Sequence, residues 1–310
     1  MESITVGIDL AKQVFSVCVM DGRGRVTQRH ELKREALRAW LMQLPAGTVV
    51  AMEACSGAHY WGRYCEQQGL LPRLMAAQFV KPFRKNSAIK NDRQDAEAIA
   101  TAARQGNMRF VSIKTEDQQA RLSWHRVREG YKKDALAVMN RIRGLLSEFG
   151  IVIGQSAVAL RRALADLETM SLPPEFEQLV RLQQRYWEAI DACEAACAKK
   201  INDHAEHDER CQRIRGLTGV GPLTADAMVA TLGNASDFKN GRQCAAWMGL
   251  TPSQFGTGGK VQLGKISCRG DSYLRTLLIQ GARSSLQRAK LTPADKATAE
   301  QLWTVQLAAR

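Results

Sequence analysis

The sequence predicts a mixed α/β domain followed by a mainly helical, all-α remainder. Its first third alternates short β-rich runs with amphipathic segments, which is the pattern of a sheet covered by helices. From residue 117 onward, apolar residues recur at helical spacing over long stretches. A chain of 310 residues has room for two domains of the usual size, roughly 100–200 residues each.

The N-terminal segment is expected to begin with an antiparallel meander. Residues 4–20 hold two β-rich runs joined by a short turn, and the stretch RVTQRHEL supplies a third strand. The elements expected next are a helix over 35–44, a strand over 48–54, a helix over 60–68 and a short strand over 71–76. The order β-β-β-α-β-α-β is that of a ribonuclease H-like domain.

Four acidic residues lie at the ends of these elements. Asp9 ends the first strand, Glu53 ends the strand after the helix, and Asp92 and Asp95 begin a helix that continues to Ala103. The three-residue spacing places both aspartates on one helical face. Carboxylates on two neighbouring strands, facing two more on a helix, form the oxygen-rich cage that hard divalent cations take. Because carboxylates this close repel, we predict a metal site there.

Ordinary structural roles are the alternative. Asp92 alone would suit a helix N-cap, and Asp95 alone would be favoured in a first turn by the helix dipole. Asp9 and Glu53 have no such role, because each interrupts an apolar strand where an unpartnered charge is costly. The metal site is therefore the favoured interpretation.

The charge balance favours a polyanionic partner. The chain has 44 Lys plus Arg against 31 Asp plus Glu, a formal charge of +13, and such a surplus attracts phosphate backbones. No run of about 18 apolar residues occurs, and MESITVGIDL enters a strand pattern at once, so we expect a cytoplasmic protein without a membrane span or signal peptide. The eight cysteines include no CxxC pair, which favours reduced thiols over zinc or disulfides.

Residues 117–149 and 176–201 are expected to form two long helices. Together they could pair as an antiparallel coiled-coil hairpin that packs against another copy and dimerises the protein. An intramolecular bundle is the alternative. The faces of the first helix that lie outside its apolar seam carry a series of basic residues: Arg121, Arg126, Arg128, Lys132, Lys133, Arg141 and Arg143.

The last third contains two glycine-rich features. Two helical segments over 214–233 flank Gly219 and Gly221 and resemble a helix-hairpin-helix element, in which glycines let backbone amides approach a phosphate. A simple turn is the alternative. Further on, we expect a glycine-rich loop with four nearby cations, which favours a phosphate cradle over a solvated basic loop. These cations are Lys260, Lys265, Arg269 and Arg275.

Five motifs in series resemble the transposases of the IS110 family, and within it the IS1111-like subgroup. They are VGIDLAK, AMEACSGAHYW, KNDRQDAEAIA, GVGPLTA and GLTPSQFGTGGK, and the resemblance covers nearly the whole chain in the same order. It implies a RuvC-like domain over 1–115 with a DEDD site, a coiled-coil segment over 116–204, and a C-terminal transposase domain over 205–310 that bears a catalytic serine.

The resemblance also implies partners and a cofactor. The four acids of the family's site correspond to Asp9, Glu53, Asp92 and Asp95, which would hold Mg²⁺ at a scissile phosphate. Lys90 and Arg93 beside them would hold the nucleic acid. A structured non-coding bridge RNA would pair with donor and target DNA, and the protein would act as a dimer or tetramer associated with the nucleoid.

The nucleophile departs from the family pattern. Related sequences usually read S-[ST]-G-G-K where this chain reads Gly256-Thr257-Gly258-Gly259-Lys260. Gly256 therefore stands at the expected serine position, and glycine has no hydroxyl to form a phosphoester. We expect an inactive or altered copy. A shift of the nucleophile to Thr257 or Ser253 is the alternative.

Three functions are consistent with these features. The main hypothesis is a recombinase that cuts and rejoins DNA with a metal site and a hydroxyl nucleophile held by different domains. The second is a RuvC-type nuclease in which the metal activates water and no covalent intermediate forms. The third is a catalytically dead protein that binds RNA and DNA.

Overall fold

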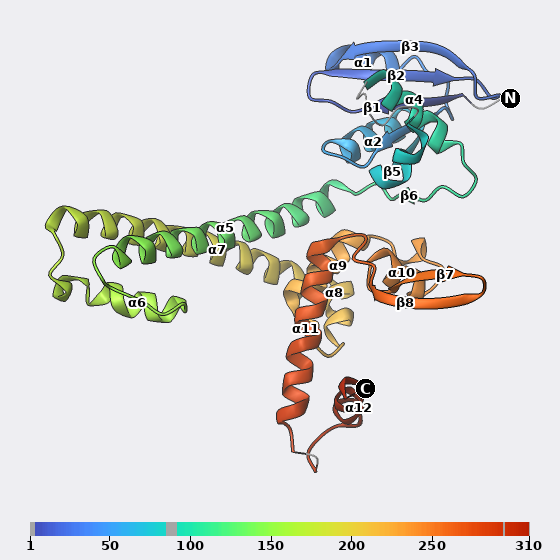
Figure 1. The fold of residues 1–310 in the computed structure, drawn as a ribbon. Helices are drawn as coiled ribbons and strands as arrows, with labels where there is room; N and C mark the ends of the chain where they lie inside the picture. The colour runs from blue at the N-terminus through green and yellow to red at the C-terminus, as the bar shows by residue number, and fades with distance from the viewer. Residues whose placement is uncertain (1–3, 85–91, 294, 310) are drawn as a thin grey trace. The chain divides into compact units, whose positions relative to one another are not determined.

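The computed structural model describes residues 4–84, 92–293 and 295–309 (Figure 1). The chain divides into two compact units, Met1–Glu116 and Asp117–Arg310. The first unit is built around a mixed sheet, and the second is mainly helical. This division into an α/β part and an α part confirms the predicted fold class at that level.

The first unit contains a six-stranded sheet of order β3-β2-β1-β4-β5-β6. Its strands are β1 (Thr5–Asp9), β2 (Val14–Met20), β3 (Val26–Lys33), β4 (Val49–Glu53), β5 (Leu71–Met75) and β6 (Phe110–Val111). β1, β2 and β3 form the predicted antiparallel meander, whereas β4 and β5 run parallel to β1. β6 pairs antiparallel with β5. It was not predicted, because two residues are too few to produce a strand pattern.

Helices cover both faces of this sheet. They are α1 (Arg34–Leu41), α2 (Ala58–Gln67), α3 (Ala77–Val80), η1 (Lys81–Phe83) and α4 (Asp92–Ala103). α1 and α2 bury Leu37 and Trp61 in one core with Val6 and Ile8 of β1. α4 packs on the opposite face, where Ile99 meets residues of β4 and β5. Because successive side chains in a strand point to opposite faces, the sheet is buried on both.

Close contact between β1 and α4 depends on Gly7. A Cβ atom at this position would lie 2.2 Å from the carbonyl oxygen of Ala96 and 2.6 Å from the backbone nitrogen of Ala100. Only hydrogen at residue 7, opposite alanines on α4, allows the two backbones to approach this closely. The same alternation that turns Gly7 toward α4 also turns Asp9, two residues later, toward the start of that helix.

We predict that Gly7→Ala destabilises the first unit. The added methyl group has no free volume, so the helix must shift, and overpacking of this kind costs about 1–3 kcal/mol. Urea unfolding measures the change in the free energy of unfolding. Gly106→Ala is the matched control, because a Cβ there meets nothing within 4 Å. Equal stability of the two variants would contradict the close packing of α4 on β1.

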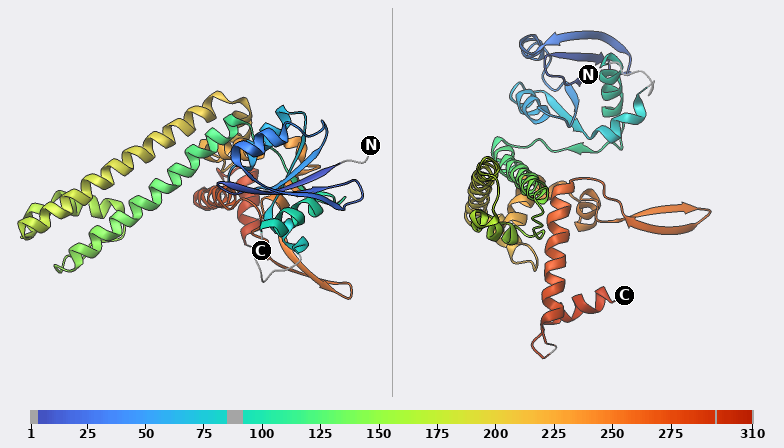
Figure 2. Two further views of the ribbon diagram at one scale, coloured as in Figure 1. Left: turned by 90° about the horizontal axis from the view of Figure 1, so that it is seen from above. Right: turned by 60° about the vertical axis from the view of Figure 1, so that its left-hand side comes forward.

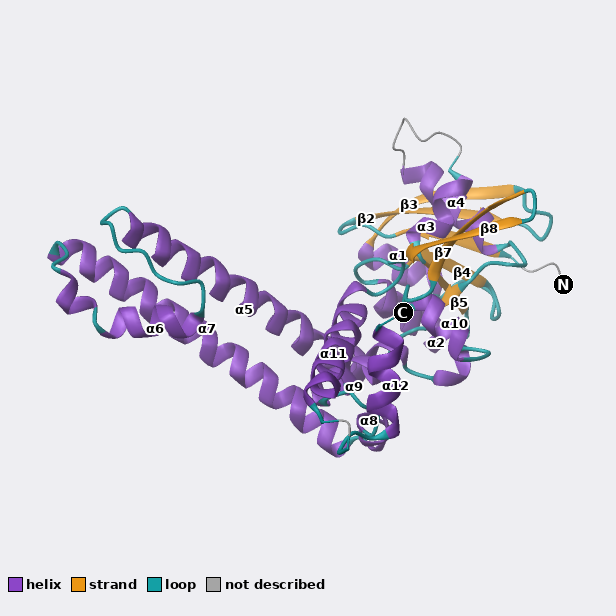
Figure 3. Ribbon diagram, turned by 60° about the horizontal axis from the view of Figure 1, so that its bottom comes forward, coloured by secondary structure: helices purple, strands orange, loops and turns teal. Residues whose placement is uncertain are grey.

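The second unit is dominated by helices (Figure 3). Its elements are α5 (Glu116–Ser147), α6 (Ala157–Ala165), η2 (Leu167–Met170), α7 (Pro174–His207), α8 (Glu209–Arg215), α9 (Pro222–Leu232), η3 (Ala235–Asp237), α10 (Gly241–Trp247), β7 (Pro252–Thr257), β8 (Lys260–Ile266), α11 (Ser272–Leu291) and α12 (Ala299–Ala308). The pair β7 and β8 forms an antiparallel hairpin where the sequence suggested a loop. Glycines at its tip and within its strands hide the strand pattern.

The long helices α5 and α7 run antiparallel (Figure 2). Near the C-terminal end of α5 and the N-terminal end of α7, α6 packs against both helices. Ile142 of α5, Leu160 of α6 and Trp187 of α7 are buried together in this core. Leu146, near the C-terminal end of α5, is fully buried in this core. Whether the pair forms a coiled coil with another copy stays a prediction.

A buried network of charges connects α5 with the helices that follow α7. Arg121 of α5 donates from Nε to Oδ1 of Asp226 on α9 at 2.9 Å and from Nη1 to Oδ2 of Asp208 at 2.7 Å. His125 lies 2.8 Å from Oδ2 of Asp226 and 2.9 Å from the hydroxyl of Tyr273 on α11. Arg121, which the sequence placed on a face outside the apolar seam, is only 6% exposed. Its partners Asp208 and Asp226 are too distant in sequence for a helical pattern to reveal them.

The network lowers the pKa of both aspartates. Burial raises the pKa of Asp226, but hydrogen bonds from His125 and Arg121 outweigh burial and leave the pKa below its ordinary value. Hydrogen bonds from Arg210 and Arg121 hold the pKa of Asp208 well below its ordinary value. Each carboxylate therefore stabilises the fold in its ionised form.

We predict that Asp208→Asn costs about 1–3 kcal/mol at pH 7, the usual cost of losing hydrogen bonds to a charged group. A depressed folded-state pKa gives stability that is present above the unfolded pKa, about 3.9, and is lost as the pH falls toward the folded value. The difference in the free energy of unfolding between wild type and variant should thus shrink below about pH 4. Urea unfolding at pH 7, 4 and 3 measures it, with exposed Glu209→Gln as the control. A pH-independent difference would contradict this origin.

No helix in the described part of the chain combines the length and apolar character that a membrane span requires.

Candidate functional site

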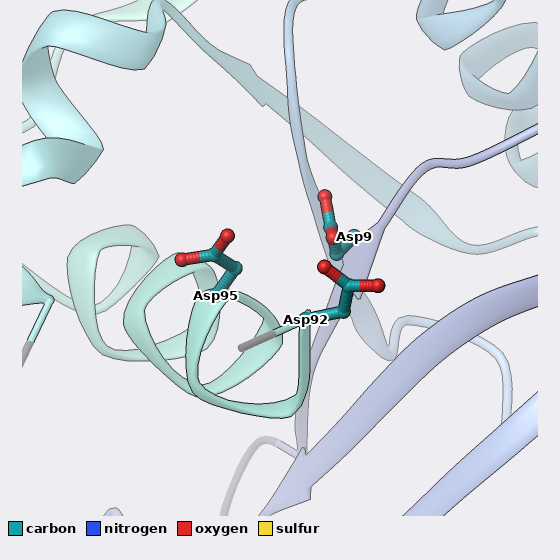
Figure 4. A group of neighbouring side chains, drawn as sticks. All are labelled: Asp9, Asp92 and Asp95. Atoms are coloured by element: carbon teal, nitrogen blue, oxygen red, sulfur yellow. The ribbon is translucent and has the colours of Figure 1, made fainter. Parts of the chain in front are cut away.

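Three of the four predicted acids meet at the N-terminus of α4. Asp9 ends β1, and Asp92 and Asp95 occupy the first turn of α4. One carboxylate oxygen from each lies within 4.8 Å of the other two, and Figure 4 shows the carboxylates gathered between the strand end and the helix. The helix dipole favours acids in this turn, but it does not account for Asp9, which comes from the sheet.

Glu53 reaches the same region from β4. This strand runs parallel to β1, so their carboxyl ends share one edge of the sheet. Ala51 faces α4 in the core, and the strand alternation turns Glu53 toward the same side. The Glu53 carboxylate is linked to the aspartates through Arg84, whose Nη2 lies 3.1 Å from Oε1 of Glu53 and whose Nε lies 3.1 Å from Oδ1 of Asp95.

Sequence reasoning missed Arg84. It directly follows η1, a short 3₁₀ turn that has no periodic pattern from which the direction of the next side chain could be inferred. The only available signal was a run of cations at Lys81, Arg84 and Lys85 between a predicted strand and the predicted acidic helix. The position of Lys85 lies outside the described residues.

The electrostatic potential around the site is negative. Desolvation of its sulfur, with the nearby carboxylates of Glu53 and Asp9, raises the pKa of the Cys55 thiol. Two cations next to the cluster are already engaged by acids at its border, since Arg93 pairs with Glu31 at 2.7 Å and Arg29 pairs with Glu97. Three clustered carboxylates, with that of Glu53 nearby, offer only oxygen donors. Such a donor set fits a hard divalent cation such as Mg²⁺.

The predicted nucleic-acid contacts of the first unit and of α5 differ in their surroundings. Lys90 lies outside the described residues, and Arg93 is exposed beside Glu31. Four cations on α5 are exposed: Arg126, Lys132, Lys133 and Arg141. Arg143 instead donates to the backbone oxygens of residues 154, 155 and 156. Its guanidinium therefore orders the segment that leads into α6.

Gly219 and Gly221 lie in the connection between α8 and α9. Gly219 has a φ of +86°, and a Cβ there would lie 2.6 Å from the hydroxyl oxygen of Ser285. Packing against α11 therefore already requires this glycine. Gly221 is the N-cap residue of α9 and borders an open cleft of about 720 Å³, whose lining includes Arg215 and Arg288.

The expected serine position lies within the β7–β8 hairpin. Gly256 pairs with Val261 across the hairpin, and a Cβ at Gly256 would have its nearest neighbour at 3.4 Å, so the backbone accepts a side chain. The hydroxyl of Ser253 donates to the backbone oxygen of Lys265 at 3.1 Å. The side chain of Thr257 lies outside the described part of the structure.

The four cations near this hairpin do not share one loop. Lys260 and Lys265 belong to β8, and Arg269 follows it; all three are exposed. Arg275 lies on α11, and its guanidinium donates to the backbone oxygens of Met248 and Arg269, each at 3.1 Å. Arg275 thus joins α11 to the segments on either side of the hairpin.

Both units match known protein families. Residues 211–299 match the model of the transposase IS116/IS110/IS902 family, and residues 6–151 match a DEDD transposase family of the IS110 type.

Individual relatives match over most of their length. A probable family 20 transposase of Pseudomonas aeruginosa is 43% identical over 96% of this chain and 87% of its own length. The transposase for insertion sequence element IS1328 of Yersinia enterocolitica is 37% identical over 93% of this chain and 86% of its own length. The transposase for insertion sequence element IS1111A of Coxiella burnetii is 37% identical over 98% of this chain and 83% of its own length.

Proposed function

Because the chain belongs to the IS116/IS110/IS902 family of transposases, we propose that it cuts DNA at a metal site formed by Asp9, Glu53, Asp92 and Asp95. The observation that carries this proposal is the meeting of three carboxylates, one from the sheet and two from α4, within 4.8 Å. The sheet edge and the helix start provide a rigid frame for them. Such a frame suits phosphoryl transfer, in which positioning supplies most of the catalysis.

The carboxylates would hold the cation and leave part of its coordination shell for substrate. Mg²⁺, when bound, would contact a scissile phosphate and neutralise the charge that develops on it. Asp95 is well suited to a fixed ligand because its side chain is only 9% exposed, whereas exposed Asp92 borders solvent. Arg93, one residue beyond Asp92, pairs with Glu31, and a phosphate of the flanking backbone would take the place of that carboxylate.

The exposed cations of α5 support a nucleic-acid partner. Arg126, Lys132, Lys133 and Arg141 would contribute affinity that depends on salt and tolerates sequence variation. We assign this face, with the hairpin cations Lys260, Lys265 and Arg269, to the donor and target DNA and to a structured guide RNA. Gly219 and Gly221 would bring the amides at the start of α9 to a phosphate.

Gly256 favours a second candidate function. In the main proposal, a side-chain hydroxyl at this position loses its proton and attacks the scissile phosphate, the bond to one DNA oxygen breaks to release a DNA hydroxyl, and a protein–DNA phosphoester forms. A DNA hydroxyl later attacks this phosphoester and releases the side-chain hydroxyl. Glycine cannot do this, whereas a nuclease reaction, in which water attacks at the carboxylate site, needs no residue of the hairpin. The chain as it stands would therefore bind nucleic acid and a divalent cation without forming a covalent adduct.

We predict that Gly256→Ser creates a covalent adduct with a nicked suicide DNA substrate in the presence of guide RNA and Mg²⁺. Room for the side chain exists, since the nearest atom to a Cβ is at 3.4 Å. Peptide mapping should place the adduct at residue 256, and Ser253→Ala in the same background should leave it unchanged. An adduct of the unmodified protein that maps to Thr257 or Ser253 would contradict the assignment of the nucleophile.

A second prediction isolates the carboxylate site. In the Gly256→Ser protein, Asp9→Asn should reduce adduct formation at least about a hundredfold, the usual order for removing a transition-state stabilising group. RNA affinity should change little, because it depends on Lys and Arg side chains. Glu35→Gln, an exposed acid on α1, provides the control. Full activity of Asp9→Asn would refute the metal-site proposal.

We also propose that the protein self-associates through the face of α7 that carries Leu182 and Tyr186. Leu182 and Tyr186 are 52% and 51% exposed, and Leu182 borders an open apolar hollow with Phe149, Phe176 and Leu179. A second copy that covers this face would bury the apolar surface. The result would be a dimer, or a tetramer of two dimers.

We predict that Leu182→Asp combined with Tyr186→Asp yields a monomer, because two buried carboxylates would oppose association. Light scattering coupled to size exclusion measures the mass. Lys199→Glu with Glu206→Lys, two exposed positions on the same helix outside this hollow, serves as the control for charge changes alone. A double Asp variant that retains the wild-type mass would place the interface elsewhere.

A further inference from the structure

The carboxylate site contains a cation of its own. The Arg84 guanidinium lies between Glu53 and Asp95, with nitrogen–oxygen distances of 3.1 Å to each. Both acids are largely shielded, with side chains 16% and 9% exposed. An ionised acid this far from solvent needs a partner, and Arg84 supplies one to both.

The two contacts of Arg84 are unequal. Nη2 donates a hydrogen bond to Oε1 of Glu53. Nε faces Oδ1 of Asp95 at 3.1 Å, yet this buried nitrogen has no aligned hydrogen-bond partner among the described residues. The Asp95 contact is therefore an ion pair with poor direction, and it costs the least to break.

Asp95 belongs to both arrangements. It is one of the three aspartates whose oxygens cluster, and it is also one of the two acids paired with Arg84. A guanidinium and a divalent cation at the same carboxylates would repel each other, because both are positive and the site is shielded. Binding of a divalent cation by all four acids would thus favour the release of Arg84 from Asp95 and Glu53.

We propose that Arg84 is a displaceable counter-cation that presets Glu53 and Asp95 and competes with the divalent cation for them. It is a positioning residue, and it lowers the affinity of the site for metal while keeping the acids in place before metal binds. The inference rests on the proposed function, because it presumes that the four acids bind a cation.

The test is Mn²⁺ binding, followed by the electron paramagnetic resonance signal of the free ion, in the absence of nucleic acid. Arg84→Gln removes the charge and should tighten Mn²⁺ binding about tenfold, the equivalent of one charge-assisted hydrogen bond. Arg84→Lys retains a cation and should bind Mn²⁺ nearly as the wild type does. In EDTA, Arg84→Gln should have a lower melting temperature, and Mn²⁺ should raise it more than in the wild type.

Arg38→Gln is the matched control, because it removes the same charge from the same unit but from a pair with Glu35 on α1. Unchanged or weaker Mn²⁺ binding by Arg84→Gln, beside normal wild-type binding, would overturn this inference alone and leave Arg84 a structural residue. If neither the wild type nor any variant, Asp95→Asn included, binds Mn²⁺, the metal site and this inference are both overturned. If Arg84→Gln unfolds in EDTA, refolding by Mn²⁺ supports the proposal, and failure to refold opposes it.

Discussion

The contact of Gly7 with Ala96 and Ala100 is the constraint on which the site depends. It lets the backbone of α4 lie directly against β1, and the acids occupy fixed places relative to it. Asp9 follows Gly7 by two residues on the same face of the strand, and Asp95 immediately precedes Ala96 on the helix. The separation of the carboxylates is therefore set by backbone packing, which is stiffer than any arrangement of side chains on loops.

Bringing acids together in this way creates an electrostatic cost that the fold must meet. The N-terminus of α4 offsets part of it, and Arg84 balances one of the two negative charges of Glu53 and Asp95 at the protected side of the site. The remaining negative potential is open toward Asp92, the exposed member. The basic surplus of the chain, +13, then works in the opposite sense, because it attracts phosphates that the acids alone would repel.

The sequence was informative where a regular helix or strand determines the direction in which a side chain points. The alternation in β1 and β4 and the spacing in α4 predicted that Asp9, Asp92 and Asp95 would meet, and it placed Glu53 at the same sheet edge. Pattern could not predict Arg84, which follows a 3₁₀ turn, or the burial of Arg121, whose partner Asp226 is remote in sequence. The β7–β8 hairpin was also missed, because glycines carry no side-chain alternation.

The central claim is that the carboxylate site brings a divalent cation to the scissile phosphate. Replacement of one non-bridging oxygen of that phosphate by sulfur tests it most directly, because Mg²⁺ binds sulfur poorly and softer cations bind it well. With the Gly256→Ser protein, we expect slow adduct formation on one phosphorothioate diastereomer in Mg²⁺ and recovery in Mn²⁺ or Cd²⁺. Equal rates for sulfur and oxygen substrates in Mg²⁺, or a defect that no softer cation restores, would contradict it.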